Sequence, residues 1–247
     1  MKIVVITGAS RGIGAAAARA CAQRGMGVIV TYKTNPEAAG RVVDGITADG
    51  GTALALPLDV ADVSSFAGFR EAVSGAAEEK WGREDIDALV NNAGYGAYTP
   101  IASVTQDEFD ALFAVHLKGP FFLTQTLLPL IASGGAVVNM ASATSRVATA
   151  GVAPYASFKG GLEVLTRYMA KEFGERGVRA NAIAPGPIRT DLGGGLTPEF
   201  EAALAAETAL GRVGEPEEVG EVVAMLLSDE GRWINAQTVE VAGGYVI

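Results

Sequence analysis

Tyr155 and Lys159 stand four residues apart in a long helical pattern, and Ser142 precedes the tyrosine by thirteen residues. Residues i and i+4 share one face of a helix, so both side chains are expected to point into one cleft. A free tyrosine with a pKa of about 10 is a poor acid near neutrality, but a nearby ammonium favours the phenolate and lowers the pKa by roughly 1–3 units. We therefore predict proton transfer to a substrate oxygen, with Tyr155 as general acid/base, Lys159 lowering its pKa and Ser142 orienting the oxygen.

A glycine-punctuated segment near the N-terminus predicts a nucleotide site. Gly8, Gly12 and Gly14 follow the apolar run Ile3–Ile6 and open a helical pattern. Glycine permits positive φ and a close approach of the backbone, and a helix N-terminus offers free N–H groups to a pyrophosphate. The spacing is Gly-x-x-x-Gly-x-Gly instead of the commoner Gly-x-Gly-x-x-Gly. A tight strand-to-helix turn without a ligand is the alternative interpretation.

Short apolar runs alternate with helical patterns along the whole chain. Several of these runs are continuously apolar, as burial on both faces of a parallel sheet requires. We predict an α/β, Rossmann-type, doubly wound sheet of about seven parallel strands, with helices on both faces and one domain over residues 1–247. The irregular stretch 187–211, with three consecutive glycines, is expected to form a mobile substrate flap. Strands are expected at residues 3–6, 28–32, 53–58, 86–90, 136–140, 178–184 and 238–241, and helices at 15–24, 37–49, 63–80, 106–117, 121–131, 155–175 and 217–227.

Composition excludes several classes of function. The net charge of −9 has no basic stripe within it, so nucleic acid is not an expected partner. One cysteine, Cys21, and one histidine exclude an internal disulfide and a His/Cys metal cluster, and no metal is expected. No apolar run approaches the ~18 residues of a membrane span. The short apolar N-terminus leaves no room for a secretory signal, so a cytoplasmic location is expected.

Four motifs occur in an order that resembles one enzyme family. They are TGASRGIG at residues 7–14, NNAG at 91–94, Ser142 with the Tyr-x-x-x-Lys pair, and PGPIRT at 185–190. The chain is similar to the short-chain dehydrogenases/reductases, in their shorter one-domain branch, which includes 3-oxoacyl reductases. The resemblance covers essentially the whole chain. It implies an NAD(P)-dependent enzyme (EC 1.1.1.-) that transfers a hydride between nicotinamide and a carbonyl or secondary alcohol.

The same resemblance implies roles for further residues. The aspartate after the third strand would contact adenine, and Lys159 would also hold the nicotinamide ribose. For Asn91, cofactor contact and bracing of the sheet are equally open. The full cofactor-binding set implied is Gly8, Ser10, Arg11, Gly12, Ile13, Gly14, Tyr32, Lys33, Asp59, Val60, Asn91, Ala93, Gly94, Tyr155, Lys159, Pro185, Gly186, Ile188 and Thr190.

The residues after the second strand favour NADP over NAD. An NAD site usually offers a carboxylate there for the ribose hydroxyls, but no acid occurs before Glu37. Arg11 in the glycine loop and Lys33 just past the strand could instead form charge-assisted bonds to a 2′-phosphate. We predict a preference for NADPH over NADH.

His116 departs from the resemblance. Relatives often carry asparagine at this position, where it acts mainly through a backbone carbonyl that holds a water beside the lysine. A side-chain change leaves that carbonyl in place, so a proton relay through His116 stays open, and an imidazole that titrates near neutrality would perturb it. A packed histidine without a relay role is the equal alternative.

The substrate is expected to be a small carbonyl or alcohol, with a 3-oxoacyl compound or a small ketone favoured. Expected lining residues include Tyr95 and Tyr98, with Arg146 and Arg189 as candidate anion contacts, although Arg189 fits a flap anchor better. The resemblance implies a homo-oligomer, a homotetramer or a dimer. The alternative function is a catalytically inactive NADP-binding regulatory protein, which the intact Ser142, Tyr155 and Lys159 disfavour.

Overall fold

The computed structural model describes all of residues 1–247 and contains one sheet of seven parallel strands. The strand order is β3-β2-β1-β4-β5-β6-β7. This confirms the predicted doubly wound sheet, and each predicted strand has its counterpart. The strands are β1 (Ile3–Ile6), β2 (Gly27–Tyr32), β3 (Thr52–Pro57), β4 (Ile86–Asn91), β5 (Ile131–Met140), β6 (Arg179–Pro185) and β7 (Thr238–Val241).

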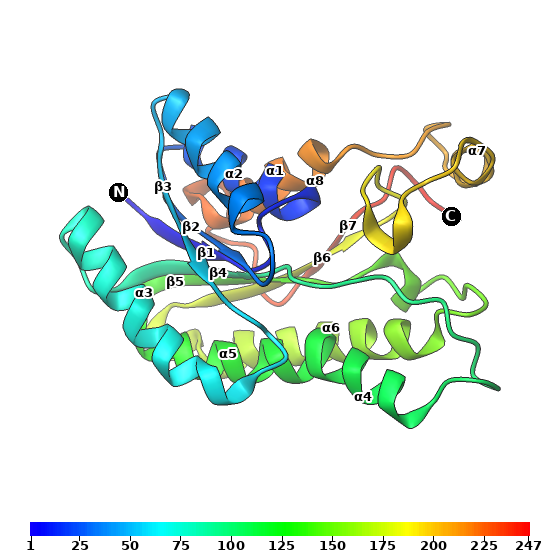
Figure 1. Ribbon diagram of the computed structural model, residues 1–247, viewed down its shortest axis with the longest axis horizontal. Helices are drawn as coiled ribbons and strands as arrows, with labels where there is room; N and C mark the ends of the chain where they lie inside the picture. Colours follow the sequence, from blue (N-terminus) through cyan, green and yellow to red (C-terminus); the bar gives the residue numbers. More distant parts are fainter.

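Two apolar cores lie on opposite faces of the sheet. Successive side chains of a strand point to opposite faces, so Val4 and Ile6 enter one core while Ile3 and Val5 enter the other. This division explains the continuously apolar strands. One face is covered by α1 (Gly12–Gln23), α2 (Pro36–Ala48) and α8 (Pro216–Leu227), and the other by α3 (Phe66–Trp81), α5 (Gly119–Leu127) and α6 (Ala153–Glu172), as Figure 1 shows.

Small residues let α1 and α8 pack closely. A Cβ added to Gly220 would lie 2.7 Å from the carbonyl carbon of Ala16. The alanine-rich α1 therefore meets α8 almost backbone to backbone, and their contact helps to fix the start of α1. Cys21 is fully buried in this core, and burial raises the pKa of its thiol to about 12, so it is a packing residue without thiolate chemistry.

The sheet reverses its order around β1, which pairs with β2 on one side and β4 on the other. Ligands of such sheets bind in the crevice at the carboxyl ends of the strands, where the order reverses. The glycine loop after β1 and the turn after β4 therefore meet at the expected site.

Two regions differ from the sequence prediction. The helix expected over 106–117 ends earlier as α4 (Gln106–Phe113) and continues in a π-helical turn, η2 (Ala114–Lys118). The stretch expected to be an irregular flap contains a helix, α7 (Pro198–Ala206), whose first turn is capped by Thr197, which accepts from the Phe200 amide at 3.2 Å. The remaining short segments are 3-10 turns, namely η1 (Val63–Ser65), η3 (Leu128–Leu130), η4 (Ala143–Ser145), η5 (Gly174–Arg176), η6 (Leu192–Gly194) and η7 (Asp229–Gly231). None of the helices is both long and apolar enough to cross a bilayer.

Candidate active site

Ser142, Tyr155 and Lys159 come together from two elements. Ser142 lies two residues after the end of β5 and caps η4, where its hydroxyl accepts from the Thr144 amide at 3.2 Å. Tyr155 and Lys159 occupy the first two turns of α6. The Lys159 ammonium donates to the Met140 carbonyl at 2.5 Å and lies 5.6 Å from the centroid of the Tyr155 ring. The predicted pair thus shares one face of its helix, against the end of β5.

The pKa values in this cluster differ from the sequence prediction. Burial raises the pKa of Tyr155, although a hydrogen bond with Ser142 works in the opposite direction. Burial also lowers the pKa of Lys159 to about 8. The expected lowering of the tyrosine pKa by lysine is therefore wrong for the protein alone, because desolvation is the largest effect on Tyr155 and the Lys159 ammonium is bonded to a backbone carbonyl.

His116 lies at the inner wall of this cluster, within the π-helical turn. Its side chain is 1% exposed, and neither ring nitrogen has a hydrogen-bond partner. The ring centroid is 4.9 Å from that of Tyr155 and 5.4 Å from that of Tyr95. Burial and the charge of Lys159 lower its pKa to about 3, and the nearby Tyr95 backbone, which favours the charged ring, does not reverse this. The ring is therefore neutral near pH 7, and the suggestion that it titrates there is wrong.

The glycine loop has the shape that a pyrophosphate requires. Gly8 has a φ of 62°, and a Cβ added to Gly14 would lie 2.5 Å from Nδ2 of Asn92 and 2.6 Å from the Gly8 carbonyl oxygen. A side chain at either position would collide with the turn after β4, because a Cβ added to Gly8 would lie 2.8 Å from Cα of Ala93. The α1 N-terminus also has no side-chain cap and no acidic residue in its first turn, so its N–H groups are available to an anion. The loop fits a dinucleotide.

Thr7 and Asn92 hold this loop against the turn after β4, although the sequence analysis gave neither residue a role. The Thr7 hydroxyl accepts from the amides of Asn92 and Ala93, each at 2.9 Å. The Asn92 side chain donates to the Thr7 carbonyl at 2.8 Å. Their signal in the sequence is that each lies within one of the two motifs, at the end of a strand, and these two strand ends must meet.

Asn91 braces the sheet. Its side chain is 4% exposed and donates to Asn139 of β5 at 2.8 Å and to Thr124 of α5 at 3.0 Å. Of the two roles considered for Asn91, its side chain has the structural one, since it points into the core and away from the glycine loop.

Lys33 and Asp59, which were given separate roles, form an ion pair. The ammonium lies 2.8 Å from the carboxylate, joining the ends of β2 and β3. Burial alone would raise the pKa of Asp59, but the bonds from Lys33 and the Ala61 amide lower it on balance. The cation expected at the 2′-phosphate is thus paired with a carboxylate.

The segment after β6 reaches the glycine loop. A Cβ added to Gly12 would lie 3.6 Å from Cγ2 of Thr190, and Ile188 forms a β-bridge with Gly214. Arg189 binds Glu215 at 3.0 Å and also Glu201. It therefore anchors this segment to α7 and α8, as the sequence favoured.

The loop after β4 forms the mouth of the site. The ring of Tyr98 packs directly against Gly151, where it leaves no room for a Cβ, and Gly96 lies against the backbone of Gly193. Tyr98 is nevertheless 73% exposed. Arg146 is excluded as an anion contact, because its guanidinium binds Glu240 at 2.6 and 3.0 Å and the C-terminal backbone.

Comparisons with known proteins agree with this architecture. The family described as enoyl-(acyl carrier protein) reductase matches residues 8–246. Elsinochrome reductase 1 of Elsinoe fawcettii is 35% identical over 258 residues, covering 98% of this chain and 93% of the relative. The 3-oxoacyl-[acyl-carrier-protein] reductase FabG of Staphylococcus aureus is 35% identical over 246 residues, covering 98% of this chain and 97% of the relative.

Solved structures of two ketoreductase complexes are also similar to this chain. The angucycline C-6 ketoreductase LanV with bound NADP has a TM-score of 0.94 and 35% identity, covering 99% of this chain and 95% of that one. A second LanV structure, with NADP and rabelomycin, has a TM-score of 0.91 and 34% identity, covering 99% and 96%. With a family match over nearly its full length, the chain belongs to the short-chain dehydrogenase/reductase family and is an NAD(P)-dependent oxidoreductase.

Proposed function

We propose that the chain is an NADPH-dependent reductase of ketones. The observation that carries the proposal is the convergence of Ser142, Tyr155 and Lys159 beside a glycine loop that fits a dinucleotide. NADP is bound by the similar LanV. Preference for NADPH over NADH follows from the lack of an acid directly after β2 and the presence of cations around the loop.

The residues divide the reaction between them. The bound nicotinamide supplies the hydride when a ketone is reduced. Tyr155 donates its phenolic proton to the substrate oxygen, and Ser142 donates a hydrogen bond that orients the same oxygen. Lys159 stabilises the phenolate that remains, because its ammonium lies 5.6 Å from the ring centroid. In the reverse direction the same phenolate accepts the proton of an alcohol.

His116 takes part as a neutral wall of the site. Its ring packs edge-on against Tyr155 at an interplanar angle of 80° and fixes the orientation of the phenol. Any relay at this position runs through the backbone, because the ring stays uncharged with a pKa of about 3.

The proposed substrate is a ketone carried on a flat ring system. Tyr95 and Tyr98, which are 39% and 73% exposed, offer aromatic surface at the mouth, where ring systems stack favourably. Two of the similar proteins are named as an elsinochrome reductase and an angucycline C-6 ketoreductase. The segment 187–211 serves as the substrate flap, since Gly193 lies against the Tyr95–Thr99 loop. A 3-oxoacyl thioester is the second candidate, favoured by the similarity to FabG.

The test is NADPH oxidation against three substrate sets, namely polycyclic aromatic ketones, 3-oxoacyl thioesters and enoyl thioesters. Turnover of the first set is expected, and turnover of enoyl thioesters alone would contradict the carbonyl chemistry. In Tyr155→Phe, kcat should fall at least ~100-fold, while the Kd of NADPH measured by fluorescence stays nearly unchanged. Near-normal turnover in this variant removes Tyr155 from the mechanism. NADPH binding without turnover of any carbonyl would favour the regulatory alternative.

A homo-oligomer and a cytoplasmic location complete the proposal. Exposed apolar side chains occur on each of the helices α4, α5 and α6, namely Phe109, Phe113, Phe121, Val164 and Tyr168. Apolar surface of this kind is typical of subunit interfaces.

A further inference from the structure

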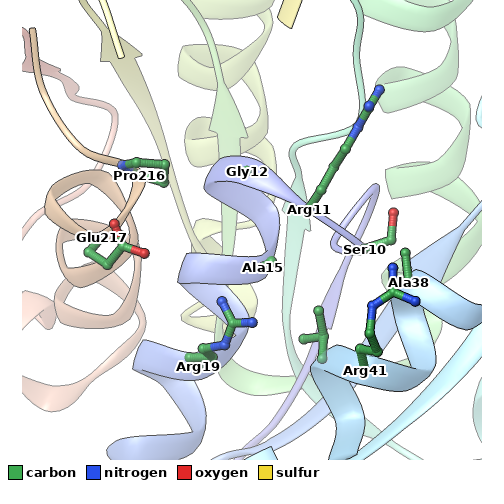
Figure 2. Close-up of a pocket in the computed structure, with 10 residues that line it drawn as sticks. Ser10, Arg11, Gly12, Ala15, Arg19, Ala38, Arg41, Pro216 and Glu217 are labelled. Atoms are coloured by element: carbon green, nitrogen blue, oxygen red, sulfur yellow. The ribbon is translucent and has the colours of Figure 1, made fainter. Parts of the chain in front are cut away.

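A cavity of about 260 Å³ lies beside the glycine loop, between α1, α2 and α8. Ser10, Arg11 and Gly12 form its upper edge, and Arg19 of α1 and Arg41 of α2 line its sides. Figure 2 shows the Arg41 guanidinium beside Ala38 and Ser10, while the side chain of Arg11 points away from it. No sequence motif assigned a function to Arg19 or Arg41.

The arginines of this cavity lack partners within the chain. Most arginines of the chain bind carboxylates or backbone carbonyls, as Arg189 and Arg212 do. Arg11, Arg19 and Arg41 have neither an ion pair nor a hydrogen bond, although the net charge is −9. Unpaired guanidiniums around one cavity repel each other, and an anion between them relieves this.

Only one carboxylate reaches the cavity. Glu217 lies on the α8 side, as Figure 2 shows, and forms no ion pair with the arginines. An anion is therefore favoured on the opposite side, between Arg41 and Ser10.

The position next to the glycine loop identifies the anion. Ser10, Arg11 and Gly12 belong both to the glycine loop and to the lining of the cavity, so a nucleotide bound by the loop would lie next to the cavity. Lys33, the alternative cation, is paired with Asp59 at 2.8 Å. We propose that Arg41, supported by Arg19, binds the 2′-phosphate of NADPH in this cavity and that cofactor selectivity depends on Arg41 more than on Lys33. The proposal rests on the proposed NADPH preference.

The experiment compares ligands that differ only by the phosphate. The Kd values of 2′,5′-ADP, 5′-AMP and inorganic phosphate are measured by calorimetry, and those of NADPH and NADH by fluorescence. Arg41→Met should weaken 2′,5′-ADP and NADPH about tenfold or more, since a charge-assisted bond is lost. Binding of 5′-AMP and NADH should stay within about twofold, because neither ligand carries the 2′-phosphate. Arg19→Met should have a smaller effect in the same direction.

Two variants serve as controls. Arg167→Met removes the same charge from an exposed arginine of α6 that also has no partner, and should change no Kd. Lys33→Met should change the 2′,5′-ADP affinity less than Arg41→Met does. All substituted side chains are exposed, so the variants should keep the melting temperature of the parent within a few degrees.

The outcomes separate the two proposals. If the parent binds 5′-AMP as tightly as 2′,5′-ADP, the NADPH preference fails and the cavity loses its assigned ligand. If the parent binds 2′,5′-ADP more tightly than 5′-AMP and Arg41→Met keeps the same ratio of Kd values, the NADPH preference stands and the role of Arg41 is overturned. If Arg41→Met no longer binds inorganic phosphate but binds 2′,5′-ADP as tightly as the parent, the cavity is a separate anion site. That result would also overturn the proposal.

Discussion

At the scale of single residues, burial decides the ionisation states of the site. Lys159 and His116 are both almost completely buried, and each has its pKa lowered by desolvation. Tyr155 has its pKa raised by the same cause. The site thus favours neutral side chains before its ligands enter. Cofactor binding must supply part of the electrostatics that the phenolate requires.

His116 makes the stability of the protein sensitive to acid. Its pKa is about 3 in the folded chain, against an ordinary value of 6.5 for histidine, so the unfolded chain binds one more proton between these values. Stability from this group is present above pH 6.5 and is lost as the pH falls toward 3. The loss amounts to about 1.4 kcal/mol per pH unit in that window. Urea unfolding should therefore show the unfolding free energy of the parent falling relative to that of His116→Asn from pH 6 to pH 4.

The same variant tests the role of the ring in catalysis. At pH 7.5 the His116 ring is neutral in both the folded and the unfolded chain. The difference in unfolding free energy between parent and variant should therefore not change with pH around that value. The pH profile of kcat should keep its shape in His116→Asn, because the ring does not titrate in the working range. A buried neutral imidazole would be contradicted if the unfolding free energies of parent and variant changed in parallel between pH 6 and pH 4. A change in the pH dependence of kcat in the variant would contradict it as well.

At the scale of elements, the site depends on how closely the loop after β1 meets the turn after β4. Thr7 and Asn92 connect these two segments by hydrogen bonds. Gly14 lies where they pass, and its missing side chain is what permits the contact. The start of α1 is thereby fixed before any nucleotide binds.

Gly14→Ala should damage the loop, whereas Gly45→Ala should not. An added Cβ at Gly14 meets Asn92 at 2.5 Å and the Gly8 carbonyl at 2.6 Å, but nothing lies within 4 Å of one at Gly45 in α2. We expect Gly14→Ala to lose about 1–3 kcal/mol of unfolding free energy and to weaken NADPH binding. Gly45→Ala should gain about 0.5–1 kcal/mol, because alanine favours the helix. Equal melting temperatures of the two variants would contradict the close contact at Gly14.

At the scale of the whole molecule, the helices on the two faces of the sheet pack through different kinds of side chain. The helices α1 and α8 pack through small residues, while α4 and α6 contact each other through aromatic rings such as Phe109 and Phe158, whose centroids are 4.9 Å apart. The helices α5 and α6 still expose Phe121, Val164 and Tyr168. A second copy of the chain would cover this surface.

Sedimentation should show a species larger than the 25.3 kDa chain. Val164→Glu places a charge on the exposed face of α6 and should shift the equilibrium toward the monomer, because a buried unpaired carboxylate is costly. Gln23→Glu, on the exposed end of α1, is the matched control and should leave the assembly unchanged. A parent that sediments as a monomer at every concentration would exclude the proposed oligomer.

The amino-acid sequence determined the parallel sheet and the family of this protein. Strands buried on both faces must be apolar throughout, and a nucleotide loop needs glycine at fixed positions, so both leave patterns that are local in the chain. The Tyr-x-x-x-Lys pair is local for the same reason, since one helix carries both residues.

Only the tertiary structure decided how residues far apart in the chain are paired and buried. It joined Lys33 to Asp59, surrounded His116 with apolar and aromatic groups, directed Asn91 into the sheet and brought Arg19 and Arg41 to one cavity. Desolvation and ion pairing depend on the distance between elements that the sequence separates widely, and no local pattern encodes that distance. The ionisation of the site and the location of its unpaired cations therefore follow from packing, while the chemistry available to it follows from the sequence.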